Sequence, residues 1–208
     1  MPKVSEEYKE KRKEEILETA REIFIKQGFE KTTMTDIVEA TGLSRGGVYQ
    51  YFSSTDEMFR HITDRNDQES KKWFLSLIEN SSTAWEAVEK LLQETEQDRL
   101  SDGIGFGVVQ FEYFLNSLRV EERASYLMKR FQFLREYFSK LIQNGVETGE
   151  FKPLQPIDAI ILFIMNVSDG LLLYRLMSFN RLGPKEVYVS EQVEALRMYL
   201  KAVLQVEQ

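Results

Sequence analysis

The sequence predicts an all-α protein, and three observations favour this fold class. Apolar residues recur at helical spacing along nearly the whole chain, no segment alternates strictly between apolar and polar residues, and Gly, Ser and Thr stand where helices would end or begin. Of the 208 residues, 42% are hydrophobic, which is enough for a packed core in one domain or two small ones.

The first two predicted helices are defined by their ends. Residues 9–27 carry apolar side chains on one helical face, and Gly28 ends that helix. Thr33 and Asp36 form a capping box, in which each side chain satisfies a free amide at the helix start. Gly42 closes this second helix after about two turns.

Two more helix starts follow. Ser44 caps a third helix, and Val48 and Phe52, four residues apart, lie on its inward face. Ser54 and Glu57 form another capping-box pattern, which opens a fourth helix. A short helix, a tight turn and a second short helix predict a helix-turn-helix, whose second helix fits the major groove of DNA.

The predicted helices become longer and richer in aromatic residues after residue 65. We therefore expect two domains, residues 1–65 and 66–208, with the boundary inside a continuous helix because no Gly- or Pro-rich linker occurs. The second domain is expected to be an antiparallel helical bundle with helices at 83–99, 102–118, 121–147, 156–179 and 188–206. Thr83 and Glu86 form a capping box at the first of these, and the second is apolar nearly all round, which predicts that it is buried.

The outward side of the third helix carries groups that suit a DNA groove. With the inward face buried, the exposed positions are Ser44, Arg45, Gly46, Gly47, Tyr49, Gln50 and Tyr51. Arg and Gln side chains can contact base edges, whereas Tyr and Ser hydroxyls and the free amides at the helix start can contact phosphates. Each of the two glycines costs roughly 0.5–1 kcal/mol relative to Ala. This cost favours the explanation that side chains there would block DNA over the alternative that the glycines ease the turn.

Two runs of residues, GFEKTTMTDI at 28–37 and GLSRGGVYQYF at 42–52, resemble the TetR family of bacterial transcriptional regulators. The resemblance implies an all-α homodimer with an N-terminal DNA-binding domain and a C-terminal domain for ligand binding and dimerisation. It places Thr33 and Thr35 near the DNA backbone, and it makes Tyr49 and Tyr51 phosphate contacts. Where the family usually has Lys at the start of the fourth helix, this chain has Thr55, which lacks the charge but can contact phosphate through its hydroxyl.

The resemblance continues more weakly at residues 144–153 and 169–171. It implies that the last two long helices, 156–179 and 188–206, form a four-helix bundle with their copies in a homodimer. The sequence favours the same arrangement through two apolar stripes, since one helix cannot bury both its core face and an extra stripe without a partner. The stripes are Val193, Leu196, Leu200 and Val203, and Leu172, Leu176 and Phe179.

The charge distribution predicts modest affinity for DNA. The net charge is −7, and residues 1–65 hold eleven Lys and Arg against thirteen Asp and Glu. Lys9, Lys11, Arg12 and Lys13 could flank DNA, but the favoured interpretation for most of these cations is a solvated helix face paired with Glu. Few neutralised phosphates imply a shallow salt dependence of binding.

The second domain offers candidate ligand-binding residues. Large apolar side chains at helical spacing are more often core than ligand cage, so polar groups inside apolar runs are the better indicators. If Glu112 or Asp169 lines a pocket, it favours a cationic amphipathic ligand; the alternatives are that these groups cap helices, pair across a dimer or face water. The candidates are Trp73, Phe74, Phe111, Glu112, Phe131, Asn166 and Asp169.

Composition excludes several other classes of protein. The chain has no Cys and a single His, His61, so disulfide frameworks, Cys-ligated zinc and di-iron sites with two Glu-x-x-His motifs are excluded. Residues 1–13 lack the apolar core of a signal peptide, and residues 160–177 are interrupted by polar groups, which makes them a poor membrane span. We expect a cytoplasmic protein with no cofactor, no metal and no catalytic residues.

The expected function is sequence-specific regulation of transcription. A repressor would bind a palindromic operator in double-stranded DNA as a homodimer and leave it when a small hydrophobic or amphipathic effector binds. The alternative is a dimeric accessory DNA-binding protein that responds to no ligand. A helical-bundle enzyme is a remote alternative, because no phosphate-binding loop or nucleophile motif occurs.

Overall fold

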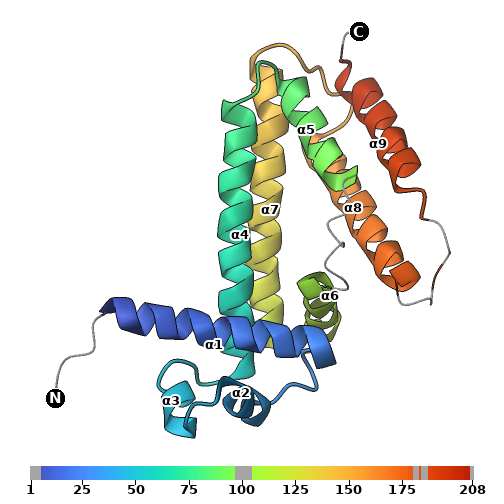
Figure 1. Cartoon of the computed structure of the whole chain (residues 1–208). Helices are drawn as coiled ribbons and strands as arrows, with labels where there is room; N and C mark the ends of the chain where they lie inside the picture. Colours follow the sequence, from blue (N-terminus) through green and yellow to red (C-terminus); the bar gives the residue numbers. More distant parts are fainter. Residues whose placement is uncertain (1–5, 97–104, 180–182, 184–186, 207–208) are drawn as a thin grey trace. The chain divides into compact units, whose positions relative to one another are not determined.

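The computed structural model describes residues 6–96, 105–179, 183 and 187–206. Throughout these ranges the chain is helical between short connections, with no β-strand, and the all-α prediction is confirmed (Figure 1). The helices are α1 (Glu6–Gln27), α2 (Met34–Thr41), α3 (Arg45–Tyr49), α4 (Thr55–Glu79), α5 (Ala84–Glu96), α6 (Gly105–Ser117), α7 (Glu121–Glu147), α8 (Ile157–Phe179) and α9 (Val189–Leu204).

The helices form two compact units, which divide inside α4 between Glu69 and Ser70. The first unit contains α1 to α3, the first part of α4, and α6. The second unit contains the rest of α4 with α5, α7, α8 and α9. The sequence-based domains, 1–65 and 66–208, assign α6 to the second domain, whereas the contacts of α6 with α1 place it in the first unit.

An aromatic cluster forms the centre of the first unit. The ring of Phe59 on α4 stacks on Tyr113 of α6 at 4.0 Å between ring centroids, and Phe29 meets both rings edge-on at 5.2 and 4.9 Å. Phe24 of α1 completes the cluster from 5.5 Å. All four side chains are buried, so α6 contributes the central ring of this cluster, whose other three rings come from residues 24–59.

The capping box at the start of α2 is confirmed. The Asp36 N–H donates to the Thr33 hydroxyl oxygen at 3.2 Å, and the Thr33 N–H donates to the Asp36 carboxylate at 2.8 Å. The donated hydrogen bonds from the Thr33 backbone and hydroxyl lower the pKa of Asp36. Gly42 ends α2 in the left-handed conformation, with φ at 65°, as the sequence predicts.

The other two capping boxes form only in part. The hydroxyls of Ser54 and Thr83 accept the N–H groups of Glu57 and Glu86, as the spacing predicts. Each Glu carboxylate then accepts the N–H of the residue before the cap, Ser53 or Ser82, instead of the N–H of the cap itself. The carboxylate therefore fixes the approach of the chain to the helix as well as the helix start.

The prediction that the helix at 102–118 is buried on all sides is wrong. On one side of α6, the side chains of Phe106, Val109 and Tyr113 are buried. Phe114 and Leu115 are about half exposed, so one side of α6 is covered and the other is not. An apolar composition alone cannot separate a helix buried all round from one with an exposed apolar side.

The core of the second unit is aliphatic and is built by α5, α7, α8 and α9. The stripe Val193, Leu196, Leu200 and Val203 lies in this core. Its use as evidence for a dimer was therefore wrong, because the chain covers this face of α9 itself. In the other stripe, Leu172 is partly buried, and the side chains of Leu176 and Phe179 lie outside the described residues.

A close packing contact links α7 to the segment that follows it. Phe151 is 2% exposed and lies against Gly145, where a Cβ would come within 2.1 Å of the ring. The Glu150 carboxylate accepts the N–H groups of Ala84 and Trp85 at the start of α5, at 2.7 and 2.8 Å. Residues 145–151 thus join α7 to α5 through a glycine, an aromatic ring and a carboxylate.

Candidate DNA-binding and effector sites

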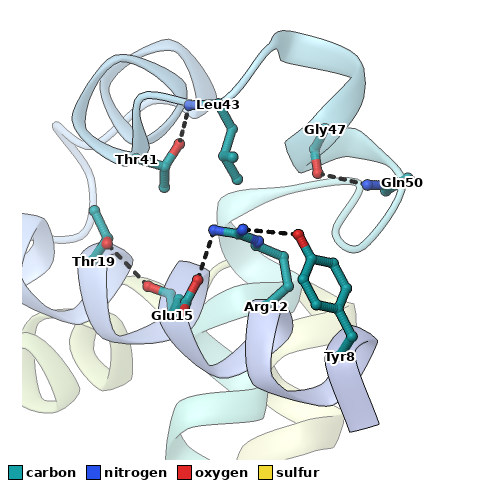
Figure 2. Close-up of polar contacts among 8 residues, drawn as sticks. All are labelled: Tyr8, Arg12, Glu15, Thr19, Thr41, Leu43, Gly47 and Gln50. Atoms are coloured by element: carbon teal, nitrogen blue, oxygen red, sulfur yellow. Dashed lines mark hydrogen bonds and ion pairs between the residues drawn. The ribbon is translucent and has the colours of Figure 1, made fainter. Parts of the chain in front are cut away.

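The turn between α2 and α3 positions the candidate recognition helix. The Gly47 N–H donates to the Ser44 hydroxyl oxygen at 3.1 Å, which confirms Ser44 as the cap of α3. In the turn itself, the Leu43 N–H donates to the hydroxyl oxygen of Thr41, a residue that the sequence analysis did not select (Figure 2). The short polar side chains thus satisfy backbone amides where the chain reverses.

Burial of Val48 and Phe52 is confirmed, at 0% and 1% exposure. However, α3 ends at Tyr49, so Phe52 reaches the core from beyond the helix rather than from its last turn. The N–H groups of Tyr51 and Phe52 both donate to the carbonyl of Val48 and keep this segment tightly wound. The recognition segment is therefore a short helix followed by a turn that two buried side chains hold in place.

The exposed side of α3 carries side chains that can donate to DNA. The Arg45 guanidinium lies 5.2 Å from the ring centroid of Tyr49, and its Nη2 donates to the Tyr49 hydroxyl at 3.5 Å. The Gln50 side-chain amide donates to the Gly47 carbonyl at 3.2 Å, which leaves its carbonyl oxygen and second N–H for a base edge (Figure 2). Arg45, Tyr49 and Gln50 are all exposed and lie within one turn and a half of the chain.

The two glycines of α3 differ in their surroundings. A Cβ at Gly46 would meet nothing within 4 Å, whereas one at Gly47 would lie 3.2 Å from the Ser44 hydroxyl oxygen. Gly46 is exposed and Gly47 is partly buried. No contact inside the described protein requires glycine at position 46. This agrees with the explanation that a side chain at position 46 would block the approach of DNA.

The remaining candidates for DNA contact lie at helix starts. Thr33 and Thr35 are exposed at the start of α2, and the Thr33 hydroxyl also donates to Asp36. Thr55, the first residue of α4, and Tyr51 are partly exposed. The start of α4 is thus marked by hydroxyl groups and by the carboxylates of Asp56 and Glu57.

Three of the six cations of α1 are paired with a Glu, so the interpretation of a solvated, paired face holds for half of them. Lys9 pairs with Glu6, and Arg21 pairs with Glu18. Arg12 pairs with Glu15 at 2.7 Å and donates to the Tyr8 hydroxyl at 3.0 Å (Figure 2). These side chains are exposed or partly exposed, so the pairs contribute little to stability.

Glu112, a candidate ligand-binding residue, lies in the first unit. Its carboxylate accepts the N–H groups of Phe29 and Glu30 at 2.9 and 3.3 Å, directly after α1 ends at Gly28. Gly28 has φ of +86°, and a Cβ there would lie 2.7 Å from a Glu112 oxygen. Glu112 therefore holds the connection between α1 and α2.

The neighbouring Tyr113 holds the start of α4, a role that the sequence analysis missed. Its hydroxyl donates to the Asp56 carboxylate at 3.0 Å, and the same carboxylate pairs with Arg60 at 2.7 Å. Burial raises the pKa of the Tyr113 hydroxyl. In the sequence, Tyr113 is one polar-tipped residue inside an apolar run, and this pattern does not show that its hydroxyl binds Asp56.

An apolar cavity of about 60 Å³ lies in the second unit. Among the residues that the structure describes, Thr95 and Ser168 supply its hydroxyl groups, and no ionisable side chain lines it. Its walls are Val88, Leu91, Leu92, Thr95, Phe138, Leu141, Ile142, Ile164, Ser168, Leu196, Leu200 and Leu204. These residues come from α5, α7, α8 and α9.

None of the seven candidate ligand-binding residues lines this cavity. Phe111 and Glu112 belong to the first unit, and Asn166 and Asp169 are exposed on α8. Trp73 and Phe131 are not among the lining residues either. Phe74 is buried, and its ring centroid lies 6.1 Å from that of Tyr137 and 5.3 Å from that of Phe138. Phe74 therefore packs against Phe138, which lines the cavity, but does not line the cavity itself.

The fold and the exposed face of α3 define a helix-turn-helix DNA-binding protein with a helical second domain. Comparison with known proteins agrees. The model of "Bacterial regulatory proteins, tetR family" matches residues 16–62, and that of "Tetracyclin repressor-like, C-terminal domain" matches residues 87–196. The chain belongs to the TetR family of bacterial transcriptional regulators.

Individual relatives support this assignment over the whole chain. The "Uncharacterized HTH-type transcriptional regulator YfiR" of Bacillus subtilis (strain 168) is 41% identical over 207 residues, which are 100% of this chain and 98% of the relative. The "HTH-type transcriptional repressor KstR2" of Mycobacterium tuberculosis (strain ATCC 25618 / H37Rv) is 23% identical over 76% of this chain and 78% of its own. A TetR transcription regulator from Haloarcula marismortui ATCC 43049 shares the fold, with a TM-score of 0.78, 15% identity and coverage of 94% and 100%.

Proposed function

We propose that this transcriptional regulator is a homodimeric, cytoplasmic repressor that binds a palindromic operator through α3 and releases it when a neutral apolar molecule enters the cavity of the second unit. The observation that carries the DNA-binding part is the exposed side of α3. On this side, Arg45 and Gln50 flank Gly46. A Cβ at Gly46 would meet no atom of the described protein within 4 Å. An open helix surface between two base-reading side chains suits the floor of a major groove.

The first experiment selects DNA with the purified full-length protein from a random double-stranded library. The selected duplex is then titrated by fluorescence anisotropy at several salt concentrations. An enriched palindrome with half-sites about 34–36 Å apart supports a dimeric regulator. Absence of any enriched sequence, with only weak binding that salt removes, would contradict sequence-specific recognition.

Variants of α3 separate the roles of its side chains. Gln50→Ala should relax selectivity at one base step by roughly 1–3 kcal/mol, whereas Tyr49→Phe should weaken binding to all sequences alike. Gly46→Ala should leave the protein folded and lower its affinity for the selected duplex. Uniform weakening by both the Gln50 and the Tyr49 variants would overturn the assignment of Gln50 as a base reader.

The dimer is supported by the exposed apolar side of α8. Leu162, Phe163, Leu173 and Tyr174 are each 38–49% exposed, although α8 is strongly apolar. By length and hydropathy, Ile157–Arg175 is also the one stretch among the described helices that could cross a membrane, and 22% of it is buried. TetR-family regulators are soluble proteins, so a second copy of α8 is the cover that we propose for this surface.

The chemistry of the cavity defines the effector class. Its lining offers apolar contacts and two hydroxyls, and a charged ligand would lose its hydration there without a counter-charge. We therefore propose a neutral apolar effector rather than the cationic amphipathic ligand that Glu112 or Asp169 would favour. A ligand of more than a few carbon atoms fits about 60 Å³ only if the lining helices move apart, and such a shift is what release of DNA requires.

A thermal-shift screen tests this assignment. Neutral fatty acyl compounds and flavonoids form one set, and amphipathic amines of matched size form the other. Stabilisation by the neutral set, together with release of the selected duplex, supports the proposal. Stabilisation by amines alone would contradict the effector class, and no stabilisation across both sets would favour the accessory DNA-binding protein.

A further inference from the structure

Lys13 of α1 holds its ammonium near an aromatic ring. Lys13 makes no salt bridge to any residue that the structure describes, whereas Lys9, Arg12 and Arg21 on the same helix each pair with a Glu. Its side chain is partly buried, and its Nζ lies 5.8 Å from the ring centroid of Phe52. The ammonium is therefore held at the junction between the recognition segment and α4.

That junction is otherwise short of positive charge. Residues 51–57 comprise Tyr51, Phe52, three hydroxyl residues, Asp56 and Glu57, and they contain no Lys or Arg. The Glu57 carboxylate is already occupied by the backbone N–H and the hydroxyl of Ser53, each at 2.7 Å. The Asp56 carboxylate is paired with Arg60. The charge of Lys13 also acts on Glu57 but forms no salt bridge with it, so the ammonium can still take a second negative charge from outside the protein.

A DNA phosphate is the group that fits. Hydroxyls can donate to a phosphate oxygen, but only a cation neutralises it and releases a counterion. The Lys13 ammonium already lies near the Phe52 ring, so the side chain loses less rotamer freedom on contact with a phosphate. The first turns of α1 also border this junction, because Tyr51 adds a small part to the raised pKa of Lys9 and of Arg12, after the larger effects of the hydrogen bonds to Glu6 and Tyr8.

We propose that Lys13 of α1 contacts a DNA phosphate beside the start of α4 and supplies the positive charge that Thr55 does not. This inference rests on the proposed DNA-binding function. It extends the DNA-binding surface from α2, α3 and the start of α4 to one defined residue of α1. It also explains how a unit with more acidic than basic residues holds the backbone next to its recognition helix.

The test compares Lys13→Met with Lys11→Met in the full-length protein. Met keeps an unbranched stem against Phe52 and removes only the charge. Lys11 is exposed and lies two residues, about 200°, around α1 from Lys13, so its variant is a matched control. The probe is the duplex that wild-type protein selects from the random library, titrated by anisotropy at several salt concentrations.

Lys13→Met should lower affinity about 3- to 10-fold at moderate salt and reduce the slope of log affinity against log salt by about one for each subunit. Lys11→Met should match wild type in both. A double variant, Lys13→Met with Thr55→Lys, should recover most of the slope, because it returns a cation to the same junction. This recovery separates loss of charge from loss of fold.

Three results would overturn the proposal. One is an unchanged salt slope in Lys13→Met, and another is an equal loss in Lys11→Met. The third is a loss in Lys13→Met that depends on the operator sequence, which would make Lys13 a base contact. Failure of the proposed function looks different, because wild-type protein would then enrich no duplex at all.

Discussion

The two units of this chain expose opposite kinds of surface. In the first unit, helix ends are capped by Thr33, Ser44 and Ser54, and the exposed residues of α3 are polar or glycine. In the second unit, α8 exposes Leu162 and Tyr174. The difference indicates two kinds of partner, because a polar helix face can meet DNA while an apolar one requires a protein surface.

The units also differ in how their interiors are fixed. The first unit joins its helices by directed polar contacts, with Glu112 and Tyr113 of α6 each bonded to a specific group elsewhere in the unit. The second unit also has directed contacts, such as those of Glu150 with the start of α5, but its interior is aliphatic and retains a cavity. Directed contacts define one geometry, whereas loosely filled apolar packing can adapt to a ligand.

The largest expected effect is on the packing of the second unit. Gly145→Ala places a Cβ into the ring of Phe151 and should lower the free energy of unfolding by about 3 kcal/mol. Phe151→Leu alone should cost about 1–2 kcal/mol, and the double variant should cost less than the sum, since the smaller side chain makes room. Chemical denaturation of the three variants measures the coupling. Strictly additive losses would mean that the Phe151 ring is not the reason why position 145 needs a glycine.

The second prediction concerns the exposed side of α8. Leu162→Asp should weaken dimerisation by at least about 30-fold, or about 2 kcal/mol, because a carboxylate would be buried between two copies. Met128→Asp on α7 introduces the same charge at a residue that is 59% exposed, and it should leave the dimer intact. Analytical ultracentrifugation over a range of concentrations distinguishes the two. A monomeric Met128 variant, or a dimeric Leu162 variant, would place the interface elsewhere.

The third prediction tests the directed contacts of the first unit. Tyr113→Phe keeps the stacked ring and removes the hydrogen bond to Asp56, so it should lower stability by about 1 kcal/mol. Tyr137→Phe in the second unit is the matched control. Within the part of the chain that the structure describes, the Tyr137 hydroxyl makes no hydrogen bond, so this variant should be close to neutral. Thermal unfolding with a separate probe for each unit provides the measurement. Equal losses in both variants would remove the distinction between the units.

The smallest effect is a pH dependence at the start of α2. Because the folded state lowers the pKa of Asp36, its contribution to stability is present above the ordinary value near 3.8 and is lost as pH falls through the folded pKa. Asp36→Asn removes this contribution. Melting curves from about pH 6 down to about pH 2 should show the variant less stable at the upper end, and the difference should shrink as pH falls below 3.8. A constant difference over that range would exclude the carboxylate charge as the cause.

The sequence was most informative where a structure depends on neighbouring residues. The capping box at Thr33 and Asp36, the left-handed Gly42 and the inward Val48 and Phe52 all rest on contacts within four residues. For the same reason the recognition segment and its exposed side chains could be located without coordinates. The length of α3 was overestimated, because the turn after Tyr49 also directs Phe52 inward.

The sequence was least informative where a contact joins distant segments. Glu112 bonds to amides more than eighty residues away, and its place inside an apolar run gives no sign of that contact. The apolar stripe on α9 was assigned to a dimer although α5 and α8 cover it. Helical periodicity shows that a face is apolar, but it does not show whether the same chain or another one covers that face.

The position of α6 has a practical consequence for building hybrid regulators. A fusion that takes residues 1–69 from this chain and the rest from another regulator would replace the central ring and the carboxylate that the first unit needs. A workable exchange must transplant residues 105–117 as well, or use a donor with Glu and Tyr at the positions of Glu112 and Tyr113. The exchangeable module is thus discontinuous along the gene although it is one body in space.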